Sequence, residues 1–335
     1  MGSSAFLPRG DAECAELALC ATWVAIYVST FIFPSSYCLT MATPPVPSRL
    51  FQADVTWATL KPDEFQWLPC LLCGSPNYES LASLVINWSE FFIVKCPRCG
   101  LIWRTPMPDP GFLSDLYSEK YFNVAEHSPS LIYQVGIADA DEQSHQMRRE
   151  RTQQEVQDWL ERGITAKNEK GQQRRLLEIG GGRGYLQLAA QEQGWDTLGV
   201  EISPHGIKSA ISKGFIVLPI PLDQLCEKYL PHVNYFDLVV FFDFLEHVTD
   251  PGLVLRMIHF TLKDDGHIIL RVPSTRQVPK LHLIDHICHF TPETLQLLLE
   301  REGFSIVETH HSGVFLAPSG DQIDNLTVTA RKRPA

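Results

Sequence analysis

The sequence is poor in basic residues, and this shortage limits the partners that it attracts. Its 335 residues contain 28 Lys and Arg against 39 Asp and Glu, a formal net charge of -11 at pH 7. Because neutralising phosphates requires clustered Lys and Arg, this balance disfavours broad nucleic-acid binding. The basic run Arg331-Lys332-Arg333 is interpreted as a solvated tail.

The cysteines lack the even, dispersed pattern of a disulfide framework. There are nine, an odd total, and four of them are grouped in two close pairs. A secreted disulfide scaffold is therefore disfavoured, and we expect a reducing compartment with a cytoplasmic location. The composition, with 44% hydrophobic and 20% charged residues, is typical of a globular protein. The length fits one catalytic domain with a smaller module.

Long apolar runs are also scarce. The stretch from Leu17 to Phe33 has no charged residue, and Pro34 interrupts it. Its length is at the lower limit for a membrane span, and the acidic residues around Arg9 disfavour a signal peptide. Residues 1–50 are thus a hydrophobic extension or a membrane anchor that leaves the catalytic domain in the cytosol. A hydrophobic surface helix and a true start at Met41 are the other interpretations.

Two units of the form Cys-x-x-Cys-Gly follow this region. They run from Cys70 to Gly74 and from Cys96 to Gly100. Each unit directs two thiolates towards one point, and its glycine permits the tight turn, so together they predict a closed structural zinc site. A redox pair is the weaker alternative. We expect a small zinc ribbon over residues 66–106, stabilised largely by metal binding. The predicted ligands are Cys70, Cys73, Cys96 and Cys99.

The segment from Leu176 to Gly184 predicts a cofactor site. An apolar strand with an acid near its end leads into a glycine-dense turn, which brings backbone N–H groups and a helix N-terminus close to a ligand. Tyr185 occupies the third glycine position of the dinucleotide pattern, so that pattern fails. An acid here suits a ligand with an ammonium group and would repel a pyrophosphate. S-adenosylmethionine has this ammonium and no phosphate. The predicted contacts are Glu178, Gly180, Gly182 and Gly184.

From Arg174 onward strands and helices alternate, which predicts an α/β domain over residues 171–331. Residues 107–170 form a helical linker and lid in this interpretation. Glu201 ends the second strand, where a ribose-binding carboxylate belongs, and Asp243 ends the fourth. We expect strands at 197–201, 215–218, 236–243, 267–272, 304–308 and 326–330, and helices at 143–162, from Pro251 to before Asp265, and at 292–302.

The spacing from Glu178 to Gly184 resembles motif I of class I S-adenosylmethionine-dependent methyltransferases. With the Glu-His pair between Phe236 and Pro251, and the His-Ile-Cys-His-Phe-Thr run, residues 66–331 resemble the zinc-ribbon branch that includes sugar C-methyltransferases. This resemblance implies a Rossmann-like seven-stranded sheet with a small N-terminal zinc ribbon. It also implies S-adenosylmethionine and structural zinc as cofactors, and O- or C-methylation of a small-molecule acceptor.

His247 is the candidate base that would remove a proton from the acceptor. The resemblance supports this role, because the matching histidine is the base in related C-methyltransferases. The plainer role of Glu246 and His247 is to cap the loop or to position the cofactor. His286 or His289 would close the other wall of the pocket, and a structural hydrogen bond is their plainer role. A metal site formed by His282, His286 and His289 is a further alternative. Tyr117 and Tyr121 are either part of an acceptor lid or core residues.

Two other function classes remain open at this point. A nucleotide-dependent oxidoreductase is disfavoured by Glu178 and Tyr185, which do not fit the dinucleotide pattern. A non-catalytic binding protein on a methyltransferase-like fold is disfavoured by the intact cofactor residues. No feature of the sequence identifies the acceptor.

Overall fold

The computed structural model describes most of the chain from residue 54 onward. Tyr117, Tyr121, His282 and the hydrophobic segment at 17–33 lie outside the described residues, so their roles stay predictions. Among the described helices, none is both long and apolar enough to cross a membrane. The described ranges are 54–56, 69–86, 89–106, 142–219, 234–274, 286–316 and 322–334.

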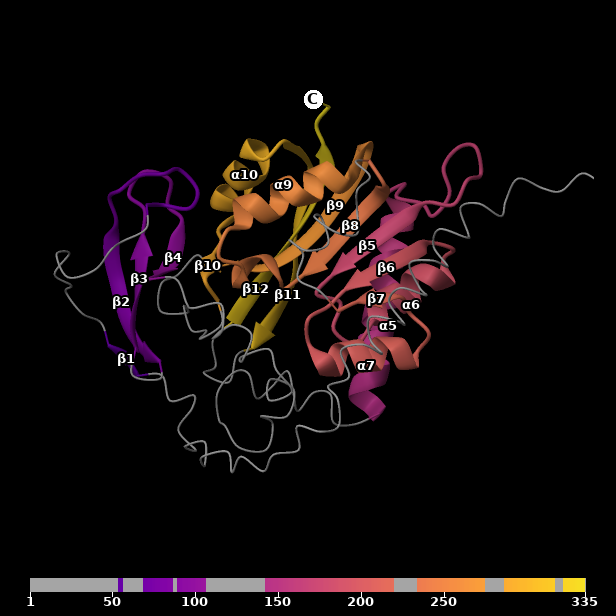
Figure 1. The fold of residues 1–335 in the computed structure, drawn as a ribbon, viewed down its shortest axis with the longest axis horizontal. Coiled ribbons are helices and arrows are strands. Elements are labelled where there is room, and N and C mark those ends of the chain that lie inside the picture. The colour runs from indigo at the N-terminus through magenta and orange to yellow at the C-terminus, as the bar shows by residue number, and fades with distance from the viewer. Residues whose placement is uncertain are drawn as a thin grey trace, which may run out of the picture. The chain divides into compact units, whose positions relative to one another are not determined.

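A seven-stranded sheet forms the core of the larger domain, in the order β11-β12-β9-β8-β5-β6-β7 (Figure 1). Strands β7, β6, β5, β8 and β9 run parallel, whereas β12 lies antiparallel between β9 and β11. This order confirms the predicted Rossmann-like sheet of seven strands. The strands are β5 Arg175–Ile179, β6 Asp196–Val200, β7 Val217–Leu218, β8 Phe236–Phe242, β9 Leu262–Ser274, β11 Phe304–Leu316 and β12 Gln322–Lys332.

The central strands form because their apolar runs are buried on both faces, as parallel sheets require. Leu177, Val239 and Leu270 are fully buried in three neighbouring strands. The predicted boundaries were correct to within one residue for the second and fourth strands, which leaves Glu201 and Asp243 just beyond them. The last three strands were predicted too short. The antiparallel pairing of β11 and β12 extends beyond the apolar stretches that marked them, and β9 already begins at Leu262, which pairs in parallel with Phe236 of β8.

Six helices are described: α5 Glu142–Glu161, α6 Tyr185–Glu192, α7 Pro204–Ser212, the 3-10 helix η4 Leu245–His247, α9 Pro251–Thr261 and α10 Pro292–Arg301. Side chains at their first turns explain where three of them begin. Ser203 accepts from the Gly206 N–H, Asp250 accepts from the Leu253 N–H, and Thr291 forms a capping box at α10.

One face of the sheet is covered by α5 and α6. Val156 and Trp159 of α5 pack with Leu186 of α6 against Leu238 and Val240 of β8. These five side chains are buried, and they fix α5 beside the strand whose end carries the candidate site. Burial of apolar area on this scale is the main favourable contribution to folding.

A second, smaller sheet has the order β1-β2-β3-β4-β10, with every neighbouring pair antiparallel. Strands β3 and β4 flank the second cysteine pair. The sequence did not predict β10, which comes from the larger domain and pairs with β4. The strands are β1 Asp54–Thr56, β2 Glu79–Ile86, β3 Ser89–Lys95, β4 Ile102–Thr105 and β10 Cys288–His289.

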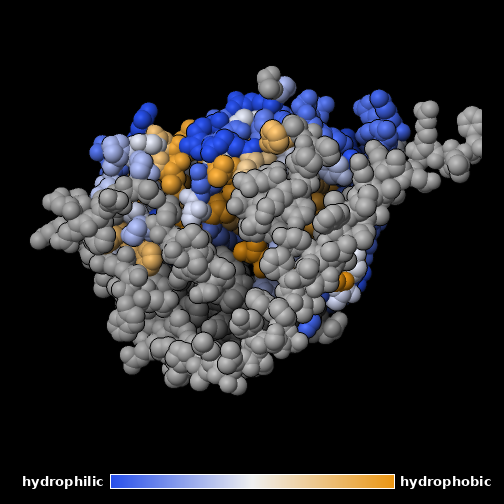
Figure 2. All heavy atoms as spheres, in the orientation of Figure 1, coloured by the Kyte–Doolittle hydropathy of each residue, from blue (hydrophilic) through white to orange (hydrophobic). Residues whose placement is uncertain are grey.

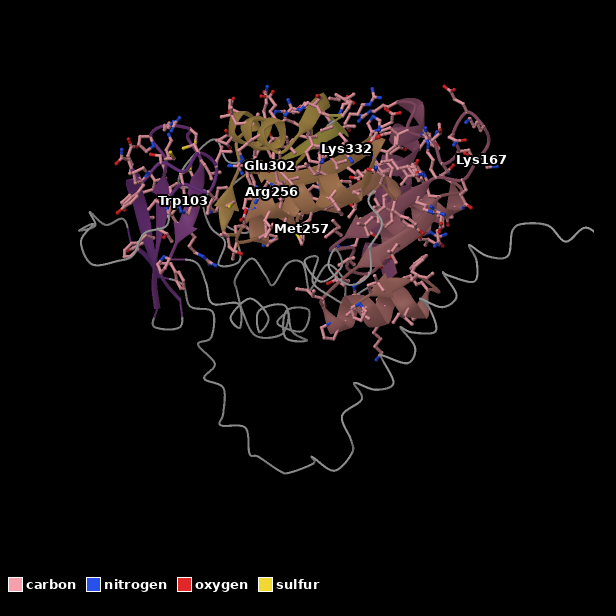
Figure 3. All side chains as sticks on the ribbon, turned by 45° about the horizontal axis from the view of Figure 1, so that its top comes forward. Trp103, Lys167, Arg256, Met257, Glu302 and Lys332 are labelled. Atoms are coloured by element: carbon pink, nitrogen blue, oxygen red, sulfur yellow. The ribbon has the colours of Figure 1, made fainter. Side chains whose placement is uncertain are left out.

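Buried charges also stabilise the larger domain. Glu302, labelled with Arg256 in Figure 3, follows α10 and pairs with Arg256 of α9 at 3.0 Å. The Lys332 ammonium is buried and donates to the Leu262 carbonyl at 2.7 Å.

The surface in Figure 2 is mainly hydrophilic along its upper edge, with separate hydrophobic areas below. Phe260 of α9 is among the exposed large hydrophobic residues.

Candidate functional site

The glycine turn after β5 has the conformation that the sequence predicted. Gly180, Gly182 and Gly184 have φ of 69°, 53° and 77°, in the left-handed region that favours glycine. Gly184 is the N-cap of α6, and a Cβ there would lie 2.9 Å from the Phe215 ring. At Gly182 a Cβ would meet no described atom within 4 Å, so this part of the turn borders open space.

Glu178 carries a buried carboxyl group beneath this turn. Its side chain fills the space beside Gly181, where an added Cβ would lie 2.6 Å from the Glu178 carboxyl carbon. Burial and the nearby negative charge of Glu201 raise the pKa of Glu178 to about 8, although a backbone N–H of Gln187 opposes the shift. Among the described residues, the buried Oε2 atom has no hydrogen-bond partner. A cation at this atom would satisfy it and favour ionisation.

Glu201 connects the end of β6 to the glycine turn. Its Oε2 accepts from the Gly182 N–H at 2.7 Å, and its Oε1 accepts from the N–H groups of Ile202 and Ser203 at 2.8 and 2.7 Å. Burial raises its pKa, against the lowering effect of these three donors. The carboxylate therefore already stabilises the turn. Oε1 is saturated by its two donors, but Oε2 keeps further acceptor capacity, which a ribose hydroxyl could use.

Asp243 occupies the first position after β8 with a φ of 52°, which is unusual for a residue other than glycine. Its half-exposed carboxylate pairs with Arg271 of β9 at 3.0 Å. Arg271 also pairs with Glu155 of α5 at 2.7 Å, and its guanidinium lies over the Phe242 ring. Sequence reasoning missed Arg271, although a lone charge within the apolar run of β9 was a usable signal.

The predicted catalytic residues come together between η4 and β10. The Glu246 Oε1 atom lies 3.8 Å from His247 Nε2 and 4.0 Å from His286 Nε2. The two imidazole rings meet edge to face, with centroids 4.7 Å apart. Glu246 and His286 are buried, so the pair of histidines shares one carboxylate in a region of low polarity. Such a cluster can accept a proton and stabilise the imidazolium that results.

His289, three residues after His286, is also buried, and its ring centroid lies 6.0 Å from that of His286. Within the described residues, two clusters have metal-ligand geometry. In one, Glu246, His247 and His286 place their ligand atoms within 4.8 Å of one another; the other contains four cysteines. The three-histidine metal alternative includes His282, which lies outside the described residues.

The four predicted zinc ligands lie together at two matching turns. The Sγ atoms of Cys70 and Cys99 are 3.5 Å apart, as are those of Cys73 and Cys96. All four lie within 4.8 Å of one another. Four thiolates at zinc-sulfur bonds of about 2.3 Å would be separated by about 3.8 Å, which is close to these values. The donor set and its spacing therefore fit a tetrahedral zinc ion.

The backbone around the cysteines has the repeated form that the glycines predicted. The N–H of Gly74 donates to the Cys70 carbonyl at 2.8 Å, and that of Gly100 donates to the Cys96 carbonyl at 2.9 Å. Both glycines have positive φ. Burial raises the pKa of Cys70 to about 11. Burial has the same effect on Cys96, but backbone donors at Cys99 and Arg98 outweigh it and lower that pKa to about 7.

Residues 147–309 match a protein-family model described as a methyltransferase domain. This match covers just under half of the chain and assigns a methyltransferase domain to that span. The matched region contains the glycine turn, Glu201 and the Glu246–His247–His286 cluster. The small β1–β4 sheet lies before it.

Comparison with curated proteins gives short matches to this chain. One is the ubiquinone biosynthesis O-methyltransferase of Bordetella avium, 28% identical over 105 residues, or 29% of this chain and 42% of that protein. Another is the mitochondrial arginine-hydroxylase NDUFAF5 of Rattus norvegicus, 38% identical over 95 residues, or 27% of this chain and 26% of that protein. The chain thus spans less than half the length of these relatives.

A similar solved structure is the 1,6-didemethyltoxoflavin-N1-methyltransferase of Burkholderia thailandensis, with bound 1,6-didemethyltoxoflavin and S-adenosylhomocysteine. It is 17% identical to this chain and has a TM-score of 0.47, over 71% of this chain and 97% of that one.

Proposed function

We propose that this protein transfers the methyl group of S-adenosylmethionine to an oxygen or carbon atom of a small-molecule acceptor. The observation that carries the proposal is the proximity of the glycine turn to the segment with the Glu-His pair. A Cβ at Gly180 would lie 3.4 Å from the Phe244 ring, and η4 begins at the next residue. A cofactor at the turn would therefore lie beside a group that can remove a proton.

The residues at the turn fit S-adenosylmethionine. The buried Glu178 Oε2, which lacks a partner among the described residues, suits the ammonium group, and the space beside Gly182 admits close approach to the backbone. The remaining acceptor capacity of Glu201 suits the ribose hydroxyls. Asp243, held by Arg271, would border the same ligand at the end of β8. When bound, the cofactor supplies an electrophilic methyl group.

The chain's own residues would perform the proton transfer. His247 accepts the proton of the acceptor hydroxyl or carbon acid, and Glu246 stabilises the resulting imidazolium through the charge on its carboxylate. His286 would form the opposite wall and orient the acceptor. Holding the acceptor in line with the methyl group contributes as much as the base, since correct orientation removes a large entropic barrier.

The four cysteines would bind a structural zinc ion in a ribbon at residues 66–106, ahead of a linker and lid at 107–170 and the catalytic domain at 171–331. With four sulfur ligands the ion would have no open coordination position, so we assign it no direct part in the reaction. Elemental analysis of the purified chain should find about one zinc per chain. Absence of zinc after refolding with Zn²⁺ would refute this assignment.

The small-molecule class of the acceptor is supported by the name of the Bordetella relative, which acts in ubiquinone biosynthesis. The test is a transfer assay with S-adenosylmethionine labelled in its methyl group, run against a metabolite extract, with mass identification of the product. A labelled product supports the proposal. Binding of S-adenosylhomocysteine without a labelled product would favour a non-catalytic binding protein.

A second outcome of the same assay is favoured by the rat relative, whose name describes an arginine hydroxylase. Mass analysis separates the two reactions, because hydroxylation adds an oxygen atom and methylation adds a labelled methyl group. A product that gains oxygen without label would overturn methyl transfer as the activity.

A further inference from the structure

The short strand β10 belongs to two parts of the molecule at once. In sequence it follows η4, which carries Glu246 and His247. In space it completes the sheet of the described residues 54–106, which we call the cysteine module. Its Cys288 pairs with Trp103 and its His289 pairs with Ile102 of β4. Trp103, labelled on this sheet in Figure 3, is completely buried, so the pairing forms in the interior of the protein.

Ile287, the residue before β10, hydrogen-bonds in both directions. Its N–H donates to the Glu246 carbonyl at 2.7 Å, and its carbonyl accepts from the Arg104 N–H at 2.8 Å. All three residues are buried to 1% exposure or less. Buried backbone groups must keep their partners, because an unmade bond there costs the full desolvation of the group. The main chain of Glu246 is therefore connected to β4 through a single residue.

The side chains beside these bonds are those of the candidate catalytic cluster. His286 precedes Ile287, and its Nε2 lies 4.0 Å from Glu246 Oε1. Its ring meets that of His247 edge to face. A displacement of Ile287 would consequently move both His286 and Glu246, whereas the glycine turn and Glu201 are attached to other strands.

The other end of β4 leads directly to the cysteines. Cys99 and β4 are separated only by Gly100 and Leu101, and the Cys96 N–H donates to the Leu101 carbonyl at 2.9 Å. The first cysteine turn is also held by the methyltransferase domain, because Arg301 at the end of α10 donates to the carbonyls of Leu71 and Leu72. Both cysteine turns are thus connected to elements that carry or flank the histidines.

We propose that the cysteine module positions the histidine cluster. Metal binding by the four cysteines holds β4, and Ile287 transmits the position of β4 to Glu246 and His286. Ile287 is the positioning residue. The catalytic consequence rests on the proposed function: loss of the metal lowers kcat and leaves cofactor affinity nearly unchanged. The structural connection itself is testable without turnover.

The experiment measures amide hydrogen exchange of the full chain before and after zinc is removed with a chelator. We expect exchange in peptides covering 245–248 and 286–290 to rise by about tenfold or more, with peptides of β5 and β6 unchanged as the internal reference. Affinity for S-adenosylhomocysteine should change by less than about twofold, and added Zn²⁺ should restore protection. Unchanged exchange in both peptides after complete metal removal would overturn the proposal.

A substitution tests the same connection if chelation unfolds the entire chain. Arg301→Gln removes the guanidinium that holds the first cysteine turn but keeps every cysteine and histidine. We expect faster exchange at 286–290 and a lower kcat with an unchanged KM for S-adenosylmethionine. Arg149→Gln, which alters an exposed ion pair on α5, is the matched control and should change neither quantity. If chelation unfolds the whole chain, this variant decides the question. Exchange at 286–290 that stays as slow in Arg301→Gln as in the native chain would then refute the connection.

The two proposals fail in different ways. If the zinc-loaded chain methylates no acceptor, the proposed function fails, while the exchange data still report whether the module holds β10. If methyl transfer occurs and survives metal removal with kcat unchanged, the positioning role fails and the function stands.

Discussion

Cofactor binding should depend steeply on pH, because a buried Glu178 must ionise to accept an ammonium group. Its pKa is raised to about 8 by burial and by Glu201. Between pH 5.5 and 7.0 its ionised fraction therefore rises about 30-fold. If the ligand binds only the carboxylate, affinity for S-adenosylhomocysteine rises by the same factor, or about 2 kcal/mol.

Isothermal titration calorimetry with S-adenosylhomocysteine over this range measures the effect. The ligand's own amino group stays protonated throughout, since α-amino groups titrate near pH 8. The Glu178→Gln variant should bind weakly and show no such slope. A flat affinity in the native chain would refute the reasoning, and so would a variant that retained the native slope.

The same carboxyl group should weaken the fold as pH rises. Its pKa in the folded chain, about 8, lies above its ordinary value of 4.5, so the folded state binds more protons than the unfolded state between these two values. The free energy of unfolding then falls from about pH 4.5 to about pH 8, by on the order of 5 kcal/mol for this group alone. Glu178→Gln should match the native chain near pH 4.5 and exceed its thermal stability at pH 8. Circular dichroism melts at both pH values check the sign.

Three further substitutions and one control test separate parts of the protein. His247→Ala should lower kcat by about 10² to 10⁴ with S-adenosylhomocysteine affinity unchanged in calorimetry, and full turnover would remove the base assignment. Gly184→Ala should lower the unfolding free energy by about 1 to 3 kcal/mol, because positive φ is combined with a Cβ 2.9 Å from Phe215. Gly214→Ala also has positive φ but meets no described atom within 4 Å, so denaturant titration should show a smaller loss. Cys99→Ser should lose the zinc in elemental analysis, and retention of one zinc per chain would contradict the assigned ligand set.

The central strands were predictable because burial on both faces leaves a continuous apolar run in the sequence. The run Phe236–Phe242 is an example, and the glycines after β5 marked the turn equally well. β10 was not predictable. Its two residues form no periodic pattern, and their partners on β4 are far away in sequence, so nothing local determines the pairing.

The sequence identified which residues lie at the site, but it did not identify their hydrogen-bond and ion-pair partners. An acid placed after a strand identified Glu201 and Asp243 by the same argument, yet Glu201 accepts backbone N–H groups whereas Asp243 pairs with Arg271. Strand position gives the edge of the sheet on which a carboxylate lies. It does not give the hydrogen-bond partners, which depend on side chains brought from other elements.

The pairing of β10 with β4 has a practical consequence for work with isolated parts of the chain. A fragment beginning at residue 142 would keep the glycine turn, Glu201 and all three members of the histidine cluster. It would also leave one side of β10 without its partner strand and expose apolar surface that Trp103 and its neighbours cover. Unpaired strand edges recruit other chains, so such a fragment should self-associate. The fragment would therefore be a poor substitute for the full chain.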